Sequence, residues 1–200
     1  MSKSESAKSS GWAFILGGFG FAAILTGSDP LAIPGSVISS ILLAVGMYRL
    51  RARYGERAGS FGRNILLLGV MGPIVFGIAI ASGNILYSSG SITNTQVEKG
   101  LWVLIFVGPA IALLGLTLFG LDALSSKPMP RLNWLPFVTG IWYPVAYSFL
   151  AGYLFTHDSK FPQQYYPALP LMLLIQFLAL CRFGVVLLTD KTEEMATASY

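Results

Sequence analysis

Charged residues are scarce in this chain. They make up 11% of its 200 residues, whereas hydrophobic residues make up 54%. A soluble domain carries about 25% charged residues, so this composition excludes an ordinary soluble protein. It fits a chain that lies in a lipid bilayer for most of its length.

Cysteine and histidine are almost absent, with one residue of each, Cys181 and His157. A lone cysteine forms no disulfide within the chain and no paired-thiol redox motif. A lone histidine cannot supply both ligands of a bis-histidine haem, and a solvated loop explains His157 and its neighbour Asp158 better than a metal site does. We therefore expect no metal and no cofactor.

Acidic residues are missing from the interior of every long apolar run, and Asp122, at the edge of one run, comes closest. Catalysis inside a membrane needs a nucleophile with a base, paired carboxylates or a metal cluster. Proton-coupled transport usually retains a buried acid. We therefore predict no catalytic residues, and the sequence argues against an enzyme.

The apolar runs themselves predict the fold. A helix needs about 20 apolar residues to cross a hydrocarbon core about 30 Å thick, and continuous apolar runs favour helices over the alternating strands of a membrane barrel. We predict an all-α, polytopic transmembrane helical bundle whose six spans form three hairpins. The predicted spans are residues 12–26, 31–50, 65–87, 101–121, 134–155 and 168–188.

Polar segments flank the predicted bundle. We assign residues 1–10 and 190–200 to polar cytoplasmic tails and residues 11–189 to one six-helix transmembrane domain. The first apolar run is short and follows Lys3 and Lys8, as in a secretory signal. We nevertheless expect it to be retained as the first span.

Lysine and arginine predict the orientation of the spans. With the N terminus inside, ten basic residues fall on the cytoplasmic side, and only Lys99 and Lys160 fall outside. The ten are Lys3, Lys8, Arg49, Arg51, Arg53, Arg57, Arg63, Lys127, Arg131 and Lys191. Because short loops rich in Lys and Arg stay in the cytoplasm, we predict that both termini are cytoplasmic.

The connection YRLRARYGERAGSFGRN is the longest basic stretch. Its arginines are Arg49, Arg51, Arg53, Arg57 and Arg63. Anionic headgroups attract each such residue by about 1 kcal/mol, so we interpret the five as a site for lipid headgroups or for docking of an acidic cytoplasmic partner. The net charge of +4 then reports topology, and no module for nucleic-acid binding is present.

Arg182 is the only charged residue well inside a predicted span. A central arginine costs about 2.5 to 3.5 kcal/mol, and its neighbours on the same helix face are apolar. Three interpretations remain open: a structural ion pair with Asp122, a binding site for an anion or headgroup, or snorkelling of the side chain into the lipid interface. Trp142 and Tyr143 could add a cation-π contact.

Uncharged polar side chains gather near the middle of the predicted spans. They are Ser36, Ser40, Tyr143, Tyr147 and Gln176. Polar groups in hydrocarbon need partners. These five residues therefore either form hydrogen bonds between helices or, together with Arg182, line a small polar pocket that binds a ligand or a partner.

Gly-Pro pairs interrupt two of the spans. Gly72-Pro73 and Gly108-Pro109 fall at corresponding positions of oppositely directed spans, and Pro144 lies near the middle of the fifth. Transporters use such interruptions to expose backbone groups to a substrate. Proline is also frequent in membrane helices, where it shapes packing, so both interpretations stay open.

These features leave two classes of function. The first is a non-catalytic multi-pass membrane protein that acts as a subunit or partner-binding accessory protein. The alternative is a compact transporter or channel for a small neutral or anionic solute with a midplane polar pocket. Expected partners are membrane lipids, anionic headgroups at the cytoplasmic face, and a membrane protein or a second copy. The absence of eukaryotic sorting signals favours a bacterial plasma membrane.

Overall fold

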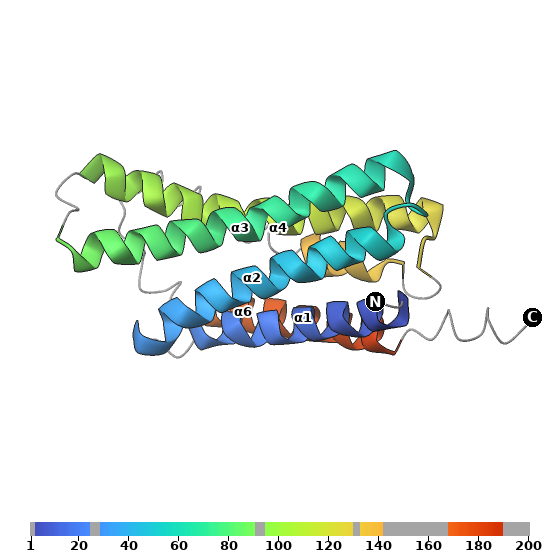
Figure 1. Cartoon of the computed structure of the whole chain (residues 1–200), viewed down its shortest axis with the longest axis horizontal. Coiled ribbons are helices and arrows are strands. Elements are labelled where there is room, and N and C mark those ends of the chain that lie inside the picture. The colour runs from blue at the N-terminus through green and yellow to red at the C-terminus, as the bar shows by residue number, and fades with distance from the viewer. Residues whose placement is uncertain (1–2, 25–28, 91–94, 130–132, 142–167, 190–200) are drawn as a thin grey trace, which may run out of the picture.

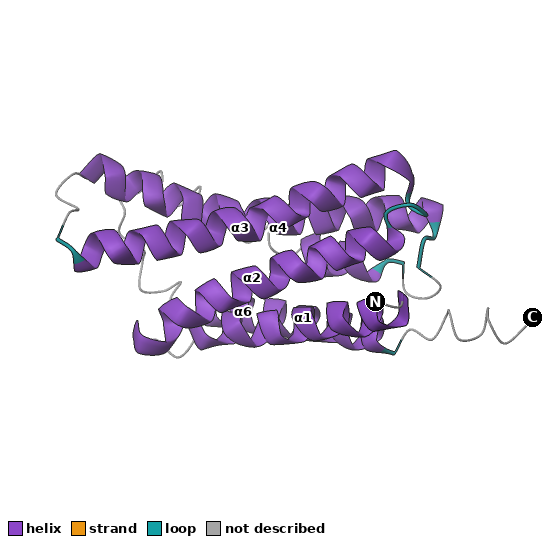
Figure 2. Cartoon of the chain, in the orientation of Figure 1, coloured by secondary structure: helices purple, strands orange, loops and turns teal. Residues whose placement is uncertain are grey.

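Five long helices and one shorter helical segment make up most of the described chain. The computed structural model describes residues 3–24, 29–90, 95–129, 133–141 and 168–189. Within these ranges there are helices, turns and short loops but no strand (Figure 2). The helices are α1 (Lys3–Ile24), α2 (Asp29–Tyr54), α3 (Gly59–Ser88), α4 (Thr95–Ser126) and α6 (Ala168–Leu188). Residues 135–141 are also helical, and the all-α prediction is confirmed.

The helices lie side by side as one bundle (Figure 1). α1 packs against α2 and α6, α2 packs against α3, and α3 packs against α4. The segment 135–141 joins the two ends of this series. Its Phe137 lies against Gly120 of α4, and its Thr139 carbonyl accepts a hydrogen bond of 3.3 Å from Gln176 of α6. The described helical segments therefore close into a ring around a shared core.

Four of the five long helices extend beyond their predicted apolar spans, whereas α6 coincides with its predicted span, residues 168–188. α3 begins at Gly59 rather than at residue 65, and α4 runs from Thr95 to Ser126 rather than over 101–121. Backbone hydrogen bonding does not stop where side chains become polar, so apolarity alone underestimates helix length. The basic stretch predicted as a loop is accordingly almost all helix, with only residues 55–58 between α2 and α3.

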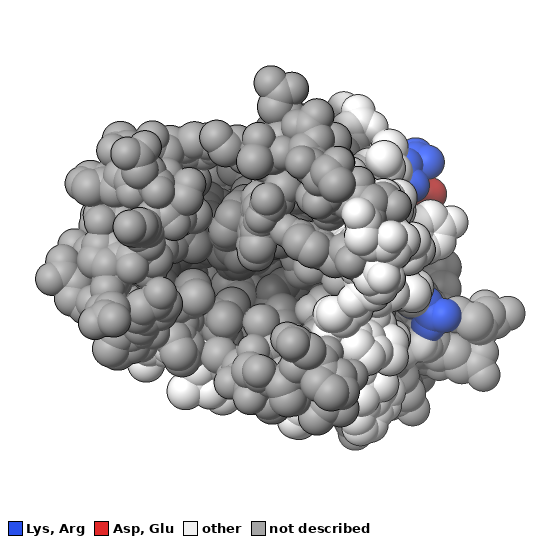
Figure 3. Space-filling model, turned by 90° about the vertical axis from the view of Figure 1, so that its left-hand side faces the viewer, with Lys and Arg blue, Asp and Glu red and all other residues white. Residues whose placement is uncertain are grey.

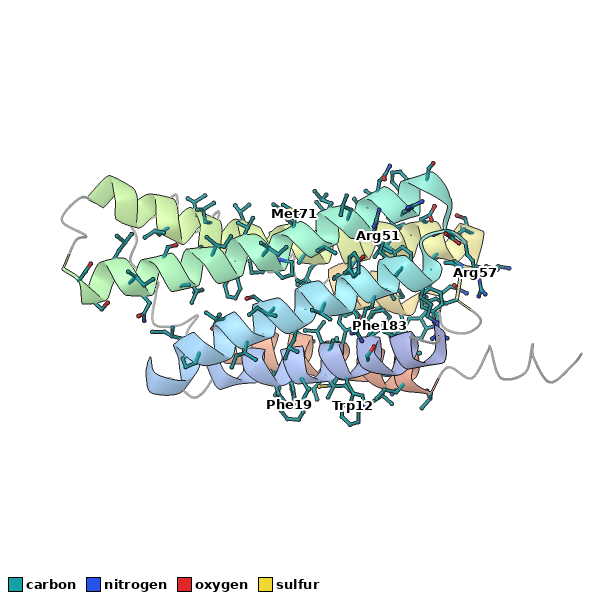
Figure 4. All side chains as sticks on the ribbon, in the orientation of Figure 1. Trp12, Phe19, Arg51, Arg57, Met71 and Phe183 are labelled. Carbon is teal, nitrogen blue, oxygen red and sulfur yellow. The ribbon has the colours of Figure 1, made fainter. Side chains whose placement is uncertain are left out.

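The outer surface of the bundle is apolar. Trp12, Phe19 and Met71 are about half exposed and point away from the helices (Figure 4). A soluble monomer rarely exposes a contiguous apolar patch larger than a few hundred Å². Three helical stretches are also long and apolar enough to cross a membrane: Ile33–Tyr54, Gly59–Leu86 and Val107–Ser126. These findings identify a membrane protein.

Basic side chains collect at one end of the bundle. α2 ends there with Arg51 and Arg53 in its last turn, where positive charge complements the carbonyl end of the helix dipole. The first residues of α1 and the last residues of α6 lie at this same end (Figure 1). Seen from the opposite end, the described surface is mostly uncharged, and the charged atoms in view lie along one edge (Figure 3). The arginine-bearing end is termed the basic end below.

Candidate functional site

Arg182 lies on the exposed side of α6. The exposed side chains of this helix include Leu174 and five residues that recur at alternating spacings of four and three: Leu171, Ile175, Leu178, Arg182 and Val185. The buried side chains of α6 lie on the opposite side and include Gln176, Leu180, Phe183 and Leu187. The five exposed residues are termed the α6 stripe. A charged group thus stands in the middle of an apolar, exposed helix face.

Contacts with α1 and α2 give the depth of Arg182 in the bundle. The next residue, Phe183, points into the bundle (Figure 4) and packs edge-on against Phe14 of α1, with ring centroids 4.9 Å apart. The Phe14 ring lies against Gly46 of α2, where an added Cβ would be 3.2 Å from it. Gly46 precedes Arg51 by about 8 Å of helix rise. Arg182 therefore lies about 8 Å farther from the basic end than Arg51 of α2 does.

Further contacts show which residue of α4 lies at the same distance from the basic end as Gly46. Met47, next to Gly46, lies against Gly69 of α3, where an added Cβ would be 3.6 Å from the Met47 sulfur. An added Cβ on Gly115 of α4 would be 2.8 Å from the Gly69 Cα. Asp122 follows Gly115 by about 10 Å of helix rise. The carboxylate is therefore much nearer the basic end than Arg182 is.

Asp122 has its own surroundings at the basic end. Its Oδ2 accepts a hydrogen bond of 3.5 Å from the Ser126 hydroxyl, and an added Cβ on Gly62 of α3 would be 2.7 Å from the same oxygen. Both Asp122 and Arg182 belong to the described residues, and no ion pair joins them. The structure does not bring these two side chains together.

Ser40 and Gln176 line the same small cavity. The cavity has a volume of about 20 Å³ and lies where α2, α3, α4 and α6 meet. Pro73 and Pro109, from the two Gly-Pro pairs, are also in its wall. A volume of about 10–15 Å³ already holds one water molecule. Two of the predicted midplane residues and both helix interruptions thus meet at a space for about one water.

Gln176 is the polar group of this wall with an unused hydrogen-bonding atom. Its Nε2 donates to the Thr139 carbonyl at 3.3 Å, while its Oε1 is buried and has no hydrogen-bond partner. The side chain is only 2% exposed. The accessible wall of the cavity is apolar, and apolar cavities stay dry, so the cavity does not supply this oxygen with a water.

Neighbouring serines of α2 have different partners. The Ser40 hydroxyl donates to the Val37 carbonyl of its own helix at 2.7 Å. The Ser39 hydroxyl donates to the Gly17 carbonyl of α1 at 2.5 Å, a link between helices that sequence reasoning missed. Ser39 could have been found because it continues the serine-rich face of α2 toward a glycine-rich helix. Of these two serines, Ser39 rather than Ser40 donates to another helix, and the Ser10 hydroxyl of α1 donates in turn to the Gly46 carbonyl of α2 at 3.4 Å.

Three other residues were predicted near the middle of the spans, namely Ser36, Tyr143 and Tyr147. Ser36 is buried on α2. Tyr143 and Tyr147 lie outside the described residues, as do Trp142 and Pro144. The structure therefore brings together Ser40 and Gln176 from the predicted set.

The five arginines predicted to bind headgroups or a partner lie at the basic end, where Figure 4 labels two of them. Arg49, Arg51 and Arg53 belong to α2, Arg57 to the following turn and Arg63 to α3. Arg51 Nε donates to the Arg63 carbonyl at 3.1 Å, and the Arg53 guanidinium lies 5.2 Å from the centroid of the Tyr54 ring. Some of these arginines therefore connect the ends of α2 and α3 in addition to supplying positive charge.

The Gly-Pro pairs of α3 and α4 pack against each other. An added Cβ on Gly72 would be 2.5 Å from the Gly108 carbonyl oxygen, and one on Gly108 would be 2.7 Å from the Phe76 nitrogen. Gly69 and Gly115 continue the contact toward the basic end. Sequence reasoning noticed both pairs but not that they face each other. The spacing of glycines along each helix was the available signal.

Within the part of the chain that the structure describes, metal-binding side chains do not gather. No group of three or more His, Cys, Asp or Glu side chains is close enough to hold a metal ion. Cys181 is a free, half-buried thiol on α6. The candidate sites are therefore the α6 stripe, the central cavity and the basic end.

Comparisons of the chain with protein-family models, with curated proteins and with solved structures found no match. Function has to be inferred from the side chains and their surroundings.

Proposed function

We propose that this protein is a non-catalytic, multi-pass membrane protein that acts as a subunit or accessory protein by binding another membrane protein along the α6 stripe. The observation that carries this proposal is the exposure of Arg182 in the middle of an apolar helix face. A central arginine costs about 2.5 to 3.5 kcal/mol in a bilayer. A partner that offsets this cost would explain why the side chain faces outward.

The proposed arrangement has six spans and cytoplasmic termini. Ten basic residues against two support this orientation, because Lys and Arg in short loops remain in the cytoplasm. The basic end would then contact anionic headgroups through its arginines. The plasma membrane of a bacterium is the proposed location, and it rests on the sequence alone.

Photo-crosslinking in the native membrane tests the proposed function. A benzophenone amino acid replaces Leu178, which is 56% exposed and lies one turn from Arg182. The matched control replaces Met71, which is 48% exposed and points outward from α3 (Figure 4). We expect a defined protein adduct from position 178 but not from position 71. Native mass spectrometry of the gently extracted protein should then show the same partner at fixed stoichiometry.

Lipid adducts alone from position 178, together with a monomer in native mass spectrometry, would contradict the proposal. Equal protein adducts from positions 178 and 71 would also contradict it, because they would reflect random collisions in the membrane. Retention of the adduct in Arg182→Lys and its loss in Arg182→Leu would tie the partner to the charge at this position.

A second candidate function is a compact transporter or channel for a small solute. The observation that favours it is the meeting of Pro73, Pro109 and Gln176 at one small cavity. At about 20 Å³ the cavity has room for one water at most, so transport of any solute would need a wider conformation. Swelling of vesicles containing the purified protein in iso-osmotic urea or glycerol, measured against empty vesicles, tests this function.

A further inference from the structure

The residues of the α6 stripe are spaced like the contact residues of a helix that packs along a second helix. Alternating steps of four and three residues give the 3.5-residue repeat at which two helices stay in contact along their length. The stripe is exposed, while α6 packs on α1 through the adjoining face that carries Phe177, Cys181 and Gly184. A second helix that crosses at about 20° can therefore cover the whole stripe.

We propose that the α6 stripe binds a transmembrane helix of a different protein, and that this helix carries one Asp or Glu opposite Arg182. The inference rests on the proposed function, because it names the partner's chemistry at the same site. A carboxylate and a guanidinium can form two parallel charge-assisted hydrogen bonds. The pair satisfies a charge that hydrocarbon cannot solvate.

Among the side chains that the structure describes, no acidic residue is placed to make that pair. The nine acidic residues lie in the tails, in the connections or toward helix ends, and Asp122 comes closest to the interior of a span. Asp122 is on α4, about 10 Å nearer the basic end than Arg182, and its carboxylate accepts a hydrogen bond from Ser126. The counter-charge therefore comes from another molecule.

A second copy of this chain is a poor occupant of the stripe. Two-fold interfaces bring the same patch of both subunits together, so a symmetric pair of α6 helices would set Arg182 against Arg182. An asymmetric contact between copies does not help, because Asp122 lies at a different depth. The occupant is therefore a different protein.

A lipid headgroup is also a poor match. Arg182 lies about 8 Å farther from the basic end than Arg51 of α2 does. A helical Cβ tilts toward the N terminus of its helix, which for α6 is the direction away from the basic end. The stripe residues on either side, Leu178 and Val185, are apolar and exposed, and they fit an apolar helix rather than a headgroup.

The test uses the full-length protein in phosphatidylcholine vesicles and two synthetic transmembrane peptides as probes. Each peptide is rich in leucine and about 22 residues long, and the two differ only in a central Glu or Gln. The protein carries a donor dye at Ser60→Cys, an exposed position near the basic end, in a Cys181→Ala background. Energy transfer to a dye on the peptide measures binding.

We expect the Glu peptide to bind at least about tenfold more tightly than the Gln peptide, which corresponds to about 1.4 kcal/mol. Arg182→Gln should abolish this preference, and Arg182→Lys should keep part of it because the charge remains. The matched control is Lys127→Gln, which changes an exposed lysine directly after α4 at the basic end and should leave the preference unchanged. Thermal unfolding of each variant shows that it is folded.

Equal binding of the two peptides, or a preference that survives in Arg182→Gln, would overturn the inference. Binding of phosphatidylglycerol that depends on Arg182, without any preference for the Glu peptide, would assign the residue to a headgroup and overturn it too. Self-association that Arg182→Gln abolishes would assign the stripe to a second copy. Equal peptide binding combined with a protein cross-link from position 178 removes only this inference, whereas the absence of any cross-linked protein removes the proposed function as well.

Discussion

The carbonyl oxygen of Gly108 lies where a side chain on Gly72 would begin. An added Cβ on Gly72 would be 2.5 Å from that oxygen, and an added Cβ on Gly108 would be 2.9 Å from the Gly72 oxygen. Cβ atoms in proteins essentially never approach other atoms within 3.0 Å. Since backbone meets backbone here, the packing of α3 on α4 depends on glycine at both positions.

Gly72→Ala should therefore lower stability by about 1 to 3 kcal/mol or more, because rigid backbone atoms of α4 cannot move aside. Gly100→Ala on α4 is the matched control, since an added Cβ there meets nothing within 4 Å. We expect the control to be neutral or stabilising by up to about 1 kcal/mol. Thermal unfolding in detergent measures both. Similar melting temperatures for the two variants would show that α3 and α4 are farther apart than they are in the structure.

Ser39→Ala should destabilise the protein more than Ser40→Ala. Ser39 links α2 to α1 through the Gly17 carbonyl, whereas Ser40 bonds within its own helix. Hydrogen bonds between membrane helices are worth about 0.6 kcal/mol on average and up to about 1.7. We expect a loss in this range for Ser39→Ala and almost none for Ser40→Ala, again by thermal unfolding. The reverse order would place the helix-linking hydroxyl at Ser40.

The order of the helices and their apolar character could be predicted because each depends only on runs of similar residues along the chain. The partner of Arg182 could not be predicted in this way. Arg182 and Asp122 both fall in the half of their predicted spans that is nearer the cytoplasmic side. The sequence gives the position of a residue along its own helix, but not how far one helix is shifted relative to another. The offset between helices is set by contacts such as Phe14 with Phe183 and Gly69 with Gly115.

The rotation of each helix about its axis was equally hard to predict. A helix that is apolar on all sides carries no stripe to mark its buried face. Sequence therefore selected Gly72 and Gly108 as interruptions but did not show that they face each other. It did select Gln176 as a polar residue in need of a partner, and in the structure the Gln176 amide donates to the Thr139 carbonyl.

Gln176→Leu should change stability by no more than about 1 kcal/mol. The variant loses the hydrogen bond to the Thr139 carbonyl, worth about 0.5–1.5 kcal/mol, and also loses a buried oxygen without a partner. Gln176→Glu should cost more, because the amide donor is lost and a carboxyl group is buried in its place. A cost above about 2 kcal/mol for Gln176→Leu would instead mean that Oε1 holds a bound donor such as water.

The proposed orientation predicts a simple labelling pattern. In a Cys181→Ala background, Ser89→Cys should react with a membrane-impermeant maleimide added to intact cells, because exposed Ser89 lies at the end of α3 opposite the basic end. Ser60→Cys, exposed near the basic end, and Ser4→Cys should react only after the cells are opened. Reaction of Ser60→Cys or Ser4→Cys in intact cells would show that the orientation is the reverse of the proposed one.

The separation of Arg182 from Asp122 predicts that their substitutions act independently. Effects of residues more than about 7–10 Å apart usually add within about 0.3–0.5 kcal/mol. Arg182→Leu should stabilise the isolated protein by up to about 3 kcal/mol, because it removes a charge from an apolar exposed face. Asp122→Asn should have the same small effect with or without Arg182, since its carboxylate contacts Ser126 instead. Thermal unfolding of the two single variants and the double variant completes the cycle. A coupling above about 1 kcal/mol would mean that the two side chains pair within the chain, and Arg182 would then need no acidic partner from another protein.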